Sequence, residues 1–437
     1  MSPVIATTSG ANVLPEEFQD AHLAQRVGQR TGPLEMAAAV ACSVAIAAVP
    51  VVSFQESYSI IGKVLALMAA AFAAMTLFKR VPKLHPAMLA YFLLVLFFGF
   101  RMVHHPDVWE EYNKLLKVCL LALASHVVFR TQKQIVLLFA IYSSAALITL
   151  TLNWGELAAF HESGMMSSSE GAIDRFAGTL QNANATGMYG ITAMLSAMIA
   201  FSRMRGFVRW LVLLVGVLSG LGLAYYSGSR KAMIGIGALS LVMPWIVVRA
   251  RKAGSVPWSR RIVLFAMLVP VAALILTNLP NSERLLRLFS ESDVGSYSGE
   301  VRYEMFWSSL RLWRQRPFIG HGYDGFARLS GFGVYSHTTY GELLCNGGLI
   351  GLGLISVFYC SPIREMVRLV RSPLDLEKRP LHTGLLTFLV LFAFFSCFAV
   401  LFGTRDYISI CAAICGYLAA SRPSEQSPRT SSKGVVQ

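Results

Sequence analysis

The stretch that decides the architecture of this chain is Ser298-Gly-Glu-Val-Arg302-Tyr-Glu-Met-Phe-Trp307, followed by Pro317-Phe-Ile-Gly-His-Gly-Tyr-Asp-Gly325. It continues through Ser336-His337-Thr-Thr-Tyr340-Gly-Glu342 into the apolar Gly348-Leu-Ile-Gly-Leu352. Residues 281–351 form the only long polar passage between segments that are otherwise apolar over membrane-crossing lengths. A connection of this length is uncommon in a compact protein unless it is functional or has structure of its own. We expect both here.

Apolar residues in the first part of this passage recur with the period of a helix. They are Val301, Met305 and Leu312, with Phe306, Leu310 and Trp313 beside them. This spacing predicts an amphipathic helix that Pro317 ends, because proline lacks the amide proton that a helix interior needs. We expect the helix to lie on the membrane surface, with the chemistry in the turns around it.

The remainder of the 437 residues has the composition of a membrane protein, with 55% hydrophobic and 14% charged residues. This composition excludes a soluble globular protein. Twelve apolar stretches approach the length of about 20 residues that an α-helix needs to cross a bilayer. They are approximately 34–54, 58–78, 86–103, 113–129, 134–153, 186–202, 208–226, 232–248, 262–278, 345–361, 382–402 and 406–420. The predicted fold class is all-α, a polytopic membrane protein with about 12 transmembrane helices.

Charge is distributed unequally between the connectors that alternate along the chain. Most of the 38 basic residues lie in one set, which comprises 1–33, 79–83, 130–133, 203–209, 249–261, 364–379 and 421–437. Such an excess marks the cytoplasmic face. We therefore expect a membrane domain at 34–420, cytoplasmic tails at 1–33 and 421–437, and periplasmic loops at 154–185 and 279–344. The net charge of +14 then reflects topology, and no nucleic-acid partner is expected.

The opposite, outer face also carries basic residues, although the charge rule predicts few there; those with candidate roles are Arg175, Arg230, Lys231, Arg302 and Arg405. Snorkelling of long side chains to the membrane surface is the alternative explanation. It explains Lys231 as well as a functional role does, whereas for Arg230 we favour function. Guanidinium groups hold phosphate oxygens through paired hydrogen bonds. The arginines are therefore predicted to converge beneath the long loop on a diphosphate at the outer membrane boundary.

His337 is distinguished by its position before an apolar segment and beside Tyr340 and Glu342. An imidazole with a reference pKa of about 6.5 can accept a proton near neutral pH. A loop histidine is nevertheless more often structural than catalytic, so the pattern alone leaves both interpretations open.

Motifs for metals and cofactors are absent from the sequence. Gly320-His-Gly-Tyr-Asp-Gly325 has GxGxxG spacing, but no strand–helix–strand unit surrounds it, so we discard a dinucleotide site. No Asp-x-Asp, HExxH or P-loop occurs, and the seven cysteines include no CxxC pair. We expect no metal, no cofactor and no disulfide framework.

Three segments of the polar passage together resemble the signature loop of the O-antigen ligase and O-antigen polymerase superfamily. They are Arg302-x3-Phe-Trp, Pro317-Phe-Ile-Gly-x-Gly-x2-Gly and His337-x2-Tyr-x-Glu-x3-Asn-Gly-Gly-Leu-Ile-Gly. Ser227-Gly-Ser-Arg230-Lys-Ala and Arg175-x2-Gly-x5-Asn184 resemble two further family segments. The resemblance covers about residues 170–355 and departs at Thr338 and Asn346, where the family often has Asn and an acidic residue.

This resemblance implies a metal-independent, inverting glycosyltransferase in the bacterial inner membrane, with its active site facing the periplasm. The donor would be a glycan linked to undecaprenyl diphosphate. For the ligase branch, which we favour, the acceptor would be a sugar hydroxyl of lipid A-core. An O-antigen or exopolysaccharide polymerase using the same donor is the alternative. A transporter of lipid-linked sugars is a distant third, because the conspicuous charges gather at one face rather than at the middle of spans.

The family roles transfer to individual positions of this chain. His337 matches the histidine proposed as general base, and Arg230 and Arg302 match arginines suited to the donor diphosphate. Arg175 and Lys231 are weaker matches for the same ligand. The residue pattern alone adds Arg405 to the diphosphate ligands, and the supporting residues are Tyr340, Glu342 and Asn184.

Overall fold

The structure is a computed structural model that describes residues 31–52, 64, 67–71, 73–77, 83–102, 108–155, 182–247, 297–372 and 376–422. Its principal elements are α2 (Pro33–Val52), α4 (Pro86–Met102), α5 (Trp109–Val128), α6 (Gln132–Leu152), α8 (Ala183–Arg203), α9 (Val208–Ser227), α10 (Arg230–Val247), α13 (Tyr297–Gln315), α14 (Gly325–Leu329), α15 (Thr339–Arg371), α16 (Arg379–Phe395) and α17 (Arg405–Ser421). Every regular element in these ranges is helical, so the predicted all-α class is confirmed.

Five of the described helices are long and apolar enough to cross a membrane. They are Pro33–Val51, Gln132–Leu152, Ala183–Arg203, Val208–Ser227 and Thr339–Arg371, and shorter apolar helices include Pro86–Met102, Lys231–Val247 and Arg379–Phe395. The predicted span 262–278 lies outside the described residues, and the predicted span 58–78 lies only partly within them. Apolar helices of this kind identify a membrane protein.

The centre of the bundle is formed by helices that are buried on all sides. Every residue of α17 from Asp406 to Ala419 is buried, and so is every residue of α8 from Thr186 to Ser202. Helices at the periphery instead expose large apolar side chains, for example Leu211, Leu214 and Leu218 of α9. Such an exposed apolar surface is expected where lipid replaces water around the protein.

Local signals in the sequence explain where several helices begin. Thr131 and Gln134 form a capping box at α6: Gln134 N donates to Thr131 Oγ1, and Thr131 N donates to Gln134 Oε1 at 2.9 Å. At α8, Asn182 Oδ1 accepts a hydrogen bond from Asn184 N at 2.9 Å. These side chains satisfy backbone amides that the first helical turn leaves without partners.

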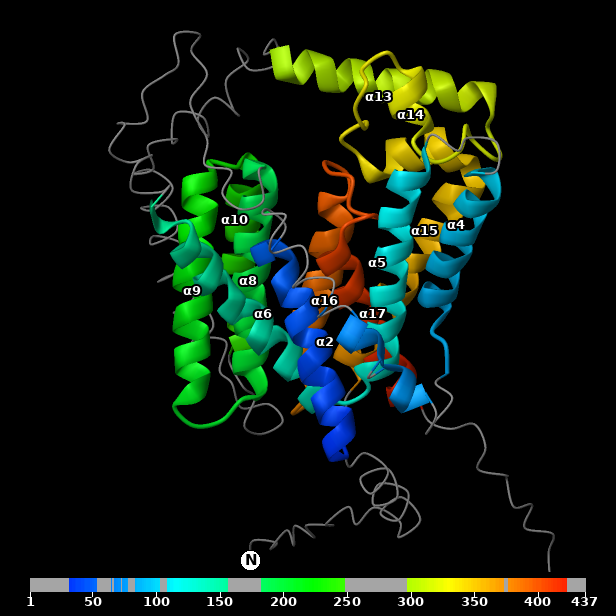
Figure 1. Cartoon of the computed structure of the whole chain (residues 1–437). Helices are drawn as coiled ribbons and strands as arrows, with labels where there is room; N and C mark the ends of the chain where they lie inside the picture. Colours follow the sequence, from blue (N-terminus) through cyan, green and yellow to red (C-terminus); the bar gives the residue numbers. More distant parts are fainter. Residues whose placement is uncertain are drawn as a thin grey trace, which may run out of the picture.

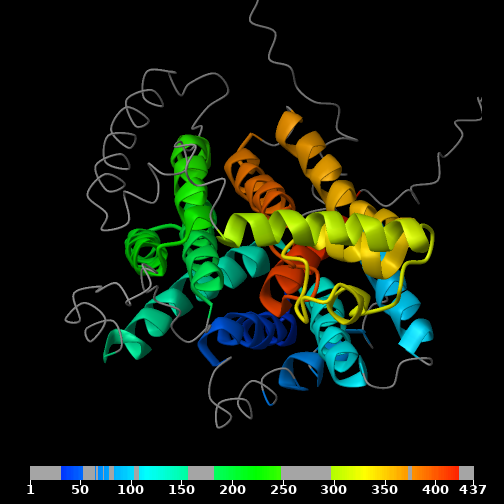
Figure 2. The same cartoon turned by 90° about the horizontal axis from the view of Figure 1, so that it is seen from above.

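The helix α13 lies across one end of the bundle, which we call the α13 end (Figure 1). Viewed from above, it runs from the side of α10 to the side of α4 (Figure 2). Met305 packs under α13 against Phe326 of α14 and Cys345 of α15, with Val301 and Leu312 beside it. The predicted amphipathic helix is therefore present, and its apolar face covers the bundle.

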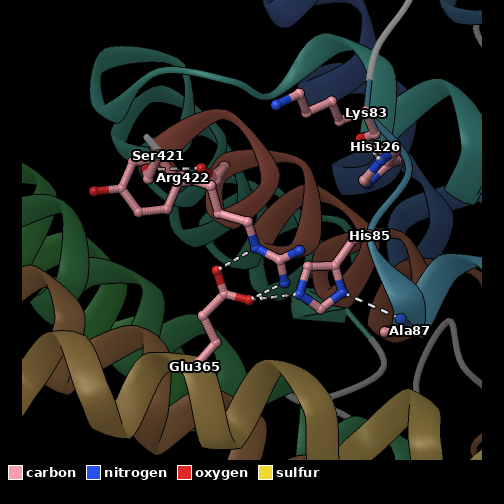
Figure 3. A network of polar contacts seen from close by, with 8 residues as sticks. Lys83, His85, Ala87, His126, Glu365, Ser421 and Arg422 are labelled. Carbon is pink, nitrogen blue, oxygen red and sulfur yellow. Dashed lines mark hydrogen bonds and ion pairs between the residues drawn. The ribbon is translucent and has the colours of Figure 1, made fainter. Parts of the chain in front are cut away.

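A cluster of charged side chains joins three chain segments at the opposite end, which we call the Glu365 end (Figure 3). His85 precedes α4, Glu365 lies near the end of α15, and Arg422 follows α17. Glu365 accepts a hydrogen bond from Arg422 Nε at 2.9 Å, and its Oε2 lies 3.0 Å from His85 Nε2. Because Ala87 N donates to His85 Nδ1, the proton of His85 resides on Nε2 and points at Glu365.

The helix α15 corrects the predicted boundaries of one span. The stretch 345–361 was expected to follow a loop, but α15 begins at Thr339 and continues to Arg371. Tyr340 and Glu342 consequently lie on a helix rather than in a loop. Basic residues such as Arg368 favour helix nearly as well as alanine, so the polar end of α15 continues the helix beyond its apolar part.

Candidate functional site

The polar passage folds into a break in α15. At Gly348 the backbone leaves the helical conformation, with φ 61° and ψ −155°. Four backbone hydrogen bonds join the two sides of this break to the segment 317–322. They are Leu349 N to Pro317 O at 2.9 Å, Ile350 N to Phe318 O at 3.1 Å, His321 N to Cys345 O at 2.9 Å, and Gly322 N to Asn346 O at 2.9 Å. The loop thus supplies partners for groups that the broken helix would leave unpaired.

Two glycines permit this close approach of backbone to backbone. Gly320 has φ 63°, and a Cβ atom there would lie 2.4 Å from the carbonyl carbon of Asn346. A Cβ atom at Gly348 would lie 2.4 Å from the carbonyl carbon of Phe318. Both the backbone angle and the space exclude a larger residue. The glycine-containing segments around Gly320 and Gly348 therefore pack against each other in a single contact.

Glu342 and Asn346 form a buried polar pair beneath the loop. Asn346 Nδ2 donates to Glu342 Oε1 at 2.9 Å, and Ser336 N donates to Glu342 Oε2 at 2.7 Å. Asn346 Oδ1 accepts a hydrogen bond from Phe326 N at 2.8 Å. The carboxylate therefore fixes the chain next to His337, which is a positioning role.

The backbone of His337 is held in an uncommon conformation. Its φ is 60°, which few non-glycine residues adopt. Thr339, two residues later, is fixed to the segment after α16: its amide donates to Ser396 O at 2.9 Å, and its hydroxyl donates to Ala399 O at 2.7 Å. Tyr340 adds a hydrogen bond from its hydroxyl to Ala393 O at 3.0 Å. Strain of this kind persists where neighbouring structure enforces it and is concentrated at functional sites.

The ring of His337 is half-buried and lies against Tyr335, with ring centroids 4.7 Å apart. Burial lowers the pKa of His337 below its ordinary value, and the positive charges of Arg302 and Lys231 lower it further. The structure thus brings a cation of α13 and a cation of α10 into electrostatic range of the predicted base. The imidazole is neutral at pH 7 and can accept a proton.

Lys231 lies in the first turn of α10. Its ammonium group donates to Phe398 O, in the same segment that holds Thr339. The start of α10 is joined to α8 by a hydrogen bond of 3.1 Å from Ser229 Oγ to Asn184 Oδ1. Asn184 therefore holds the residue two positions before Lys231.

The other predicted ligands of the diphosphate have different placements. Arg302 is exposed on α13, and within the described part of the chain it forms no ion pair with a carboxylate. Arg405 begins α17 with an exposed side chain, but no described contact or charge effect connects it to His337. Arg230 begins α10, its side chain lies outside the description, and Arg175 lies outside the described residues.

Sequence reasoning missed the segment 396–401, which anchors both Thr339 and Lys231. This stretch was assigned to the span 382–402 because it is apolar, but α16 ends at Phe395. The segment contributes backbone carbonyls, which no side-chain pattern reveals. His321 was left without a role, and its Nε2 lies 2.8 Å from Leu312 O, which fastens the loop to α13.

The arrangement combines one neutral imidazole with cations on neighbouring elements, at the end of a membrane bundle. Such a site can remove a proton from a hydroxyl group beside a bound anion. Among the described residues, no group of three His, Cys, Asp or Glu side chains has the arrangement of a metal site.

Comparison with known proteins identifies one domain. No curated protein matches the chain. Residues 215–356 match the family model described as O-antigen ligase. This segment is about a third of the chain, and it contains Lys231, Arg302 and His337 together with both halves of the glycine contact. Residues 215–356 are therefore similar to the O-antigen ligase family, in agreement with the resemblance seen in the sequence.

Proposed function

We propose that this protein is an O-antigen ligase that moves a glycan from undecaprenyl diphosphate to a sugar hydroxyl of lipid A-core. The family match supports a membrane glycosyltransferase of the O-antigen ligase or polymerase type. The observation that carries the specific mechanism is the half-buried His337, on whose ring the charges of Arg302 and Lys231 both act.

In the proposed reaction, His337 accepts the proton of the acceptor hydroxyl while the oxygen of that hydroxyl attacks the anomeric carbon of the donor. The bond from that carbon to the diphosphate oxygen breaks, and its electron pair leaves with the diphosphate. A single displacement of this kind inverts the configuration at the anomeric carbon. Arg302 and Lys231 stabilise the negative charge that develops on the leaving group. A positioned base typically contributes about 10²–10⁴ in rate.

The cations serve the reaction in two ways. They attract the diphosphate, and they keep the neighbouring imidazole unprotonated until the acceptor hydroxyl arrives. A protonated His337 would be repelled by Arg302 and Lys231, so the base form is favoured in the resting site. Arg230, Arg175 and Arg405 remain further candidates for the diphosphate.

The site is assigned to the periplasmic face of the bacterial inner membrane, with both termini in the cytoplasm. This assignment rests on the excess of basic residues in the opposite set of connectors. The predicted loop 279–344, whose last residues belong to α15, then forms the catalytic side of a membrane domain at 34–420, and the predicted loop 154–185 is assigned to the same face.

The test is reconstitution of the full chain with undecaprenyl-diphosphate glycan and lipid A-core. We expect transfer in the wild type, and at equal membrane abundance a loss of at least about 100-fold in His337→Gln and Arg302→Gln. Arg314→Gln is the matched control, because Arg314 is also exposed on α13. Undiminished transfer by His337→Gln would eliminate the mechanism. Extension of a second lipid-linked glycan in place of lipid A-core would identify a polymerase, and dependence on ATP or an ion gradient would identify a transporter.

A further inference from the structure

A second pair of cations lies at the α13 end, on the side of α4. Arg101, in the last turn of α4, donates from Nη1 to Ile319 O at 2.5 Å, and its guanidinium lies 6.0 Å from the centre of the Phe97 ring. Arg316 follows α13 directly, and its carbonyl accepts a hydrogen bond from Gly320 N at 2.9 Å. The charge of Arg316 acts on Arg101. The guanidinium of Arg101 and the backbone of Arg316 thus contact the same peptide unit, between Ile319 and Gly320, which brings these two arginines from distant parts of the chain together.

No carboxylate compensates this pair within the described part of the chain, where neither Arg101 nor Arg316 takes part in an ion pair. Like charges at short range repel each other. Arg101 uses one of its five N–H donors on Ile319, which leaves the others for a ligand. Adjacent guanidinium groups with free donors match the oxygens of a phosphate.

An exposed apolar surface adjoins these arginines. Its residues come from the end of α4, the segment 317–322 and the second part of α15, which the hydrogen bonds of the docked loop hold together. They are Phe100 (79% exposed), Phe318 (67%), Ile319 (47%), Leu349 (45%) and Ile350 (44%). At the end of a membrane bundle, a surface of this kind contacts lipid chains. Cations beside it are suited to the charged headgroup of an amphiphile.

This pair is separate from the cations around His337. Fourteen positions separate Arg302 from Arg316, which corresponds to about 21 Å along a helix at 1.5 Å per residue. One diphosphate cannot reach both. A transferase that joins two membrane-borne substrates requires a place for each, and an oligosaccharide headgroup can extend along α13 from one place to the other.

We propose that Arg101 and Arg316 bind a phosphate on the headgroup of the acceptor lipid, while its acyl chains lie on the apolar surface beside them. The proposal rests on the proposed function for the identity of the acceptor. It assigns the two substrates to opposite ends of α13, with the donor diphosphate near Arg302 and the acceptor phosphate near Arg316.

Direct binding tests this assignment without the chemical step. The full chain in phosphatidylcholine nanodiscs is titrated with phosphorylated lipid A-core and with the same glycolipid after its phosphates have been removed. We expect the wild type to bind the phosphorylated form about tenfold or more tightly, and Arg316→Gln and Arg101→Gln each to weaken that binding by about tenfold. Arg314→Gln is the matched control and should bind as the wild type does.

Three outcomes would overturn the proposal: equal binding of both glycolipid forms, unchanged binding by the Arg101→Gln/Arg316→Gln double variant, or equally effective competition by phosphatidylglycerol. The last would indicate a general site for anionic lipid.

Arg101→Lys is a control for folding, because it keeps the positive charge at the end of α4. If this variant binds the phosphorylated glycolipid better than Arg101→Gln does, the loss in Arg101→Gln is a loss of binding and not a folding defect in α4. A folded His337→Gln variant that binds acceptor normally but transfers nothing separates this site from the catalytic step. In transfer assays the arginine variants should raise the KM for acceptor and leave the KM for donor unchanged.

Discussion

The two ends of the bundle treat their charged residues in opposite ways. At the Glu365 end, one carboxylate joins a buried histidine and an arginine, so that each of these two side chains has a carboxylate partner (Figure 3). At the α13 end, Arg302, Arg101 and Arg316 have no carboxylate partner among the described residues, and the charge of Arg302 instead acts on His337. Charges that are paired within the chain contribute to the fold, whereas charges without a carboxylate partner are available to a ligand.

The two ends also differ in what holds them together. Side chains join the segments of the Glu365 cluster, whereas at the α13 end backbone hydrogen bonds between the segment 317–322 and the break in α15 add to side-chain bonds such as that of Ser336 N to Glu342. Among the described residues, these three arginines of the α13 end form no ion pair in the contact at this break. The difference predicts that each end fails through a different kind of substitution.

The largest effect is expected for Gly348→Ala, which breaks the α13 end. The new Cβ would meet the Phe318 backbone at 2.4 Å, and alanine would have to adopt φ 61°. Strain and overpacking together should destabilise this end by about 4 kcal/mol. Gly353→Ala is the matched control on the same helix, where nothing lies within 4 Å, and it should be neutral or slightly stabilising. The readout is thermal unfolding of the purified variants; equal stability would contradict the docked geometry.

A smaller effect is expected at the Glu365 end. Glu365→Gln removes the charge that joins His85 to Arg422 and should lower the stability by about 2 kcal/mol, because the glutamate side chain is only 17% exposed. Glu377→Gln is the control, since that partner of Arg203 is 71% exposed and its pair should contribute less than about 0.5 kcal/mol. Transfer per folded molecule should be unchanged in both. A loss of transfer without a loss of stability would show that the Glu365 end takes part in function.

Local patterns in the sequence predicted the parts of this site that lie within one element. The spacing of Val301, Met305 and Leu312 identified α13 and its buried face, since helical periodicity needs no knowledge of distant residues. The assignment of Arg302 and Lys231 to a diphosphate beneath the loop came from motif resemblance and from the charge rule applied to connectors, and it stays a prediction.

Contacts between distant segments could not be predicted in this way. Gly320 and Gly348 each have a plausible local role in a turn. Only the folded chain shows that each glycine packs against the backbone of the segment that contains the other, where a Cβ atom would not fit. Arg101 was counted as the end of a span, and its neighbour Arg316 lies more than 200 residues away. The charge rule places Arg405 on the predicted outer face, but it does not say which other residues lie beside it, so its role in the diphosphate site stays a prediction.

The smallest effect, and the finest test of the α13 end, concerns the pH dependence of transfer. Burial, Arg302 and Lys231 together lower the pKa of His337, so its base form predominates from below pH 6.5 upward. The value of kcat/KM should therefore rise with pH and reach its plateau at a lower pH than an exposed histidine would give.

Loss of one cation removes part of this effect. In Arg302→Gln and Lys231→Gln the pKa of His337 should rise, and the acidic limb of the residual activity should move to higher pH by less than about one unit. Arg314→Gln should leave the limb in place. A limb that stays fixed or moves to lower pH in both variants would mean that these charges do not act on the catalytic base. Arg302 and Lys231 would then bind the donor without tuning the group that activates the acceptor.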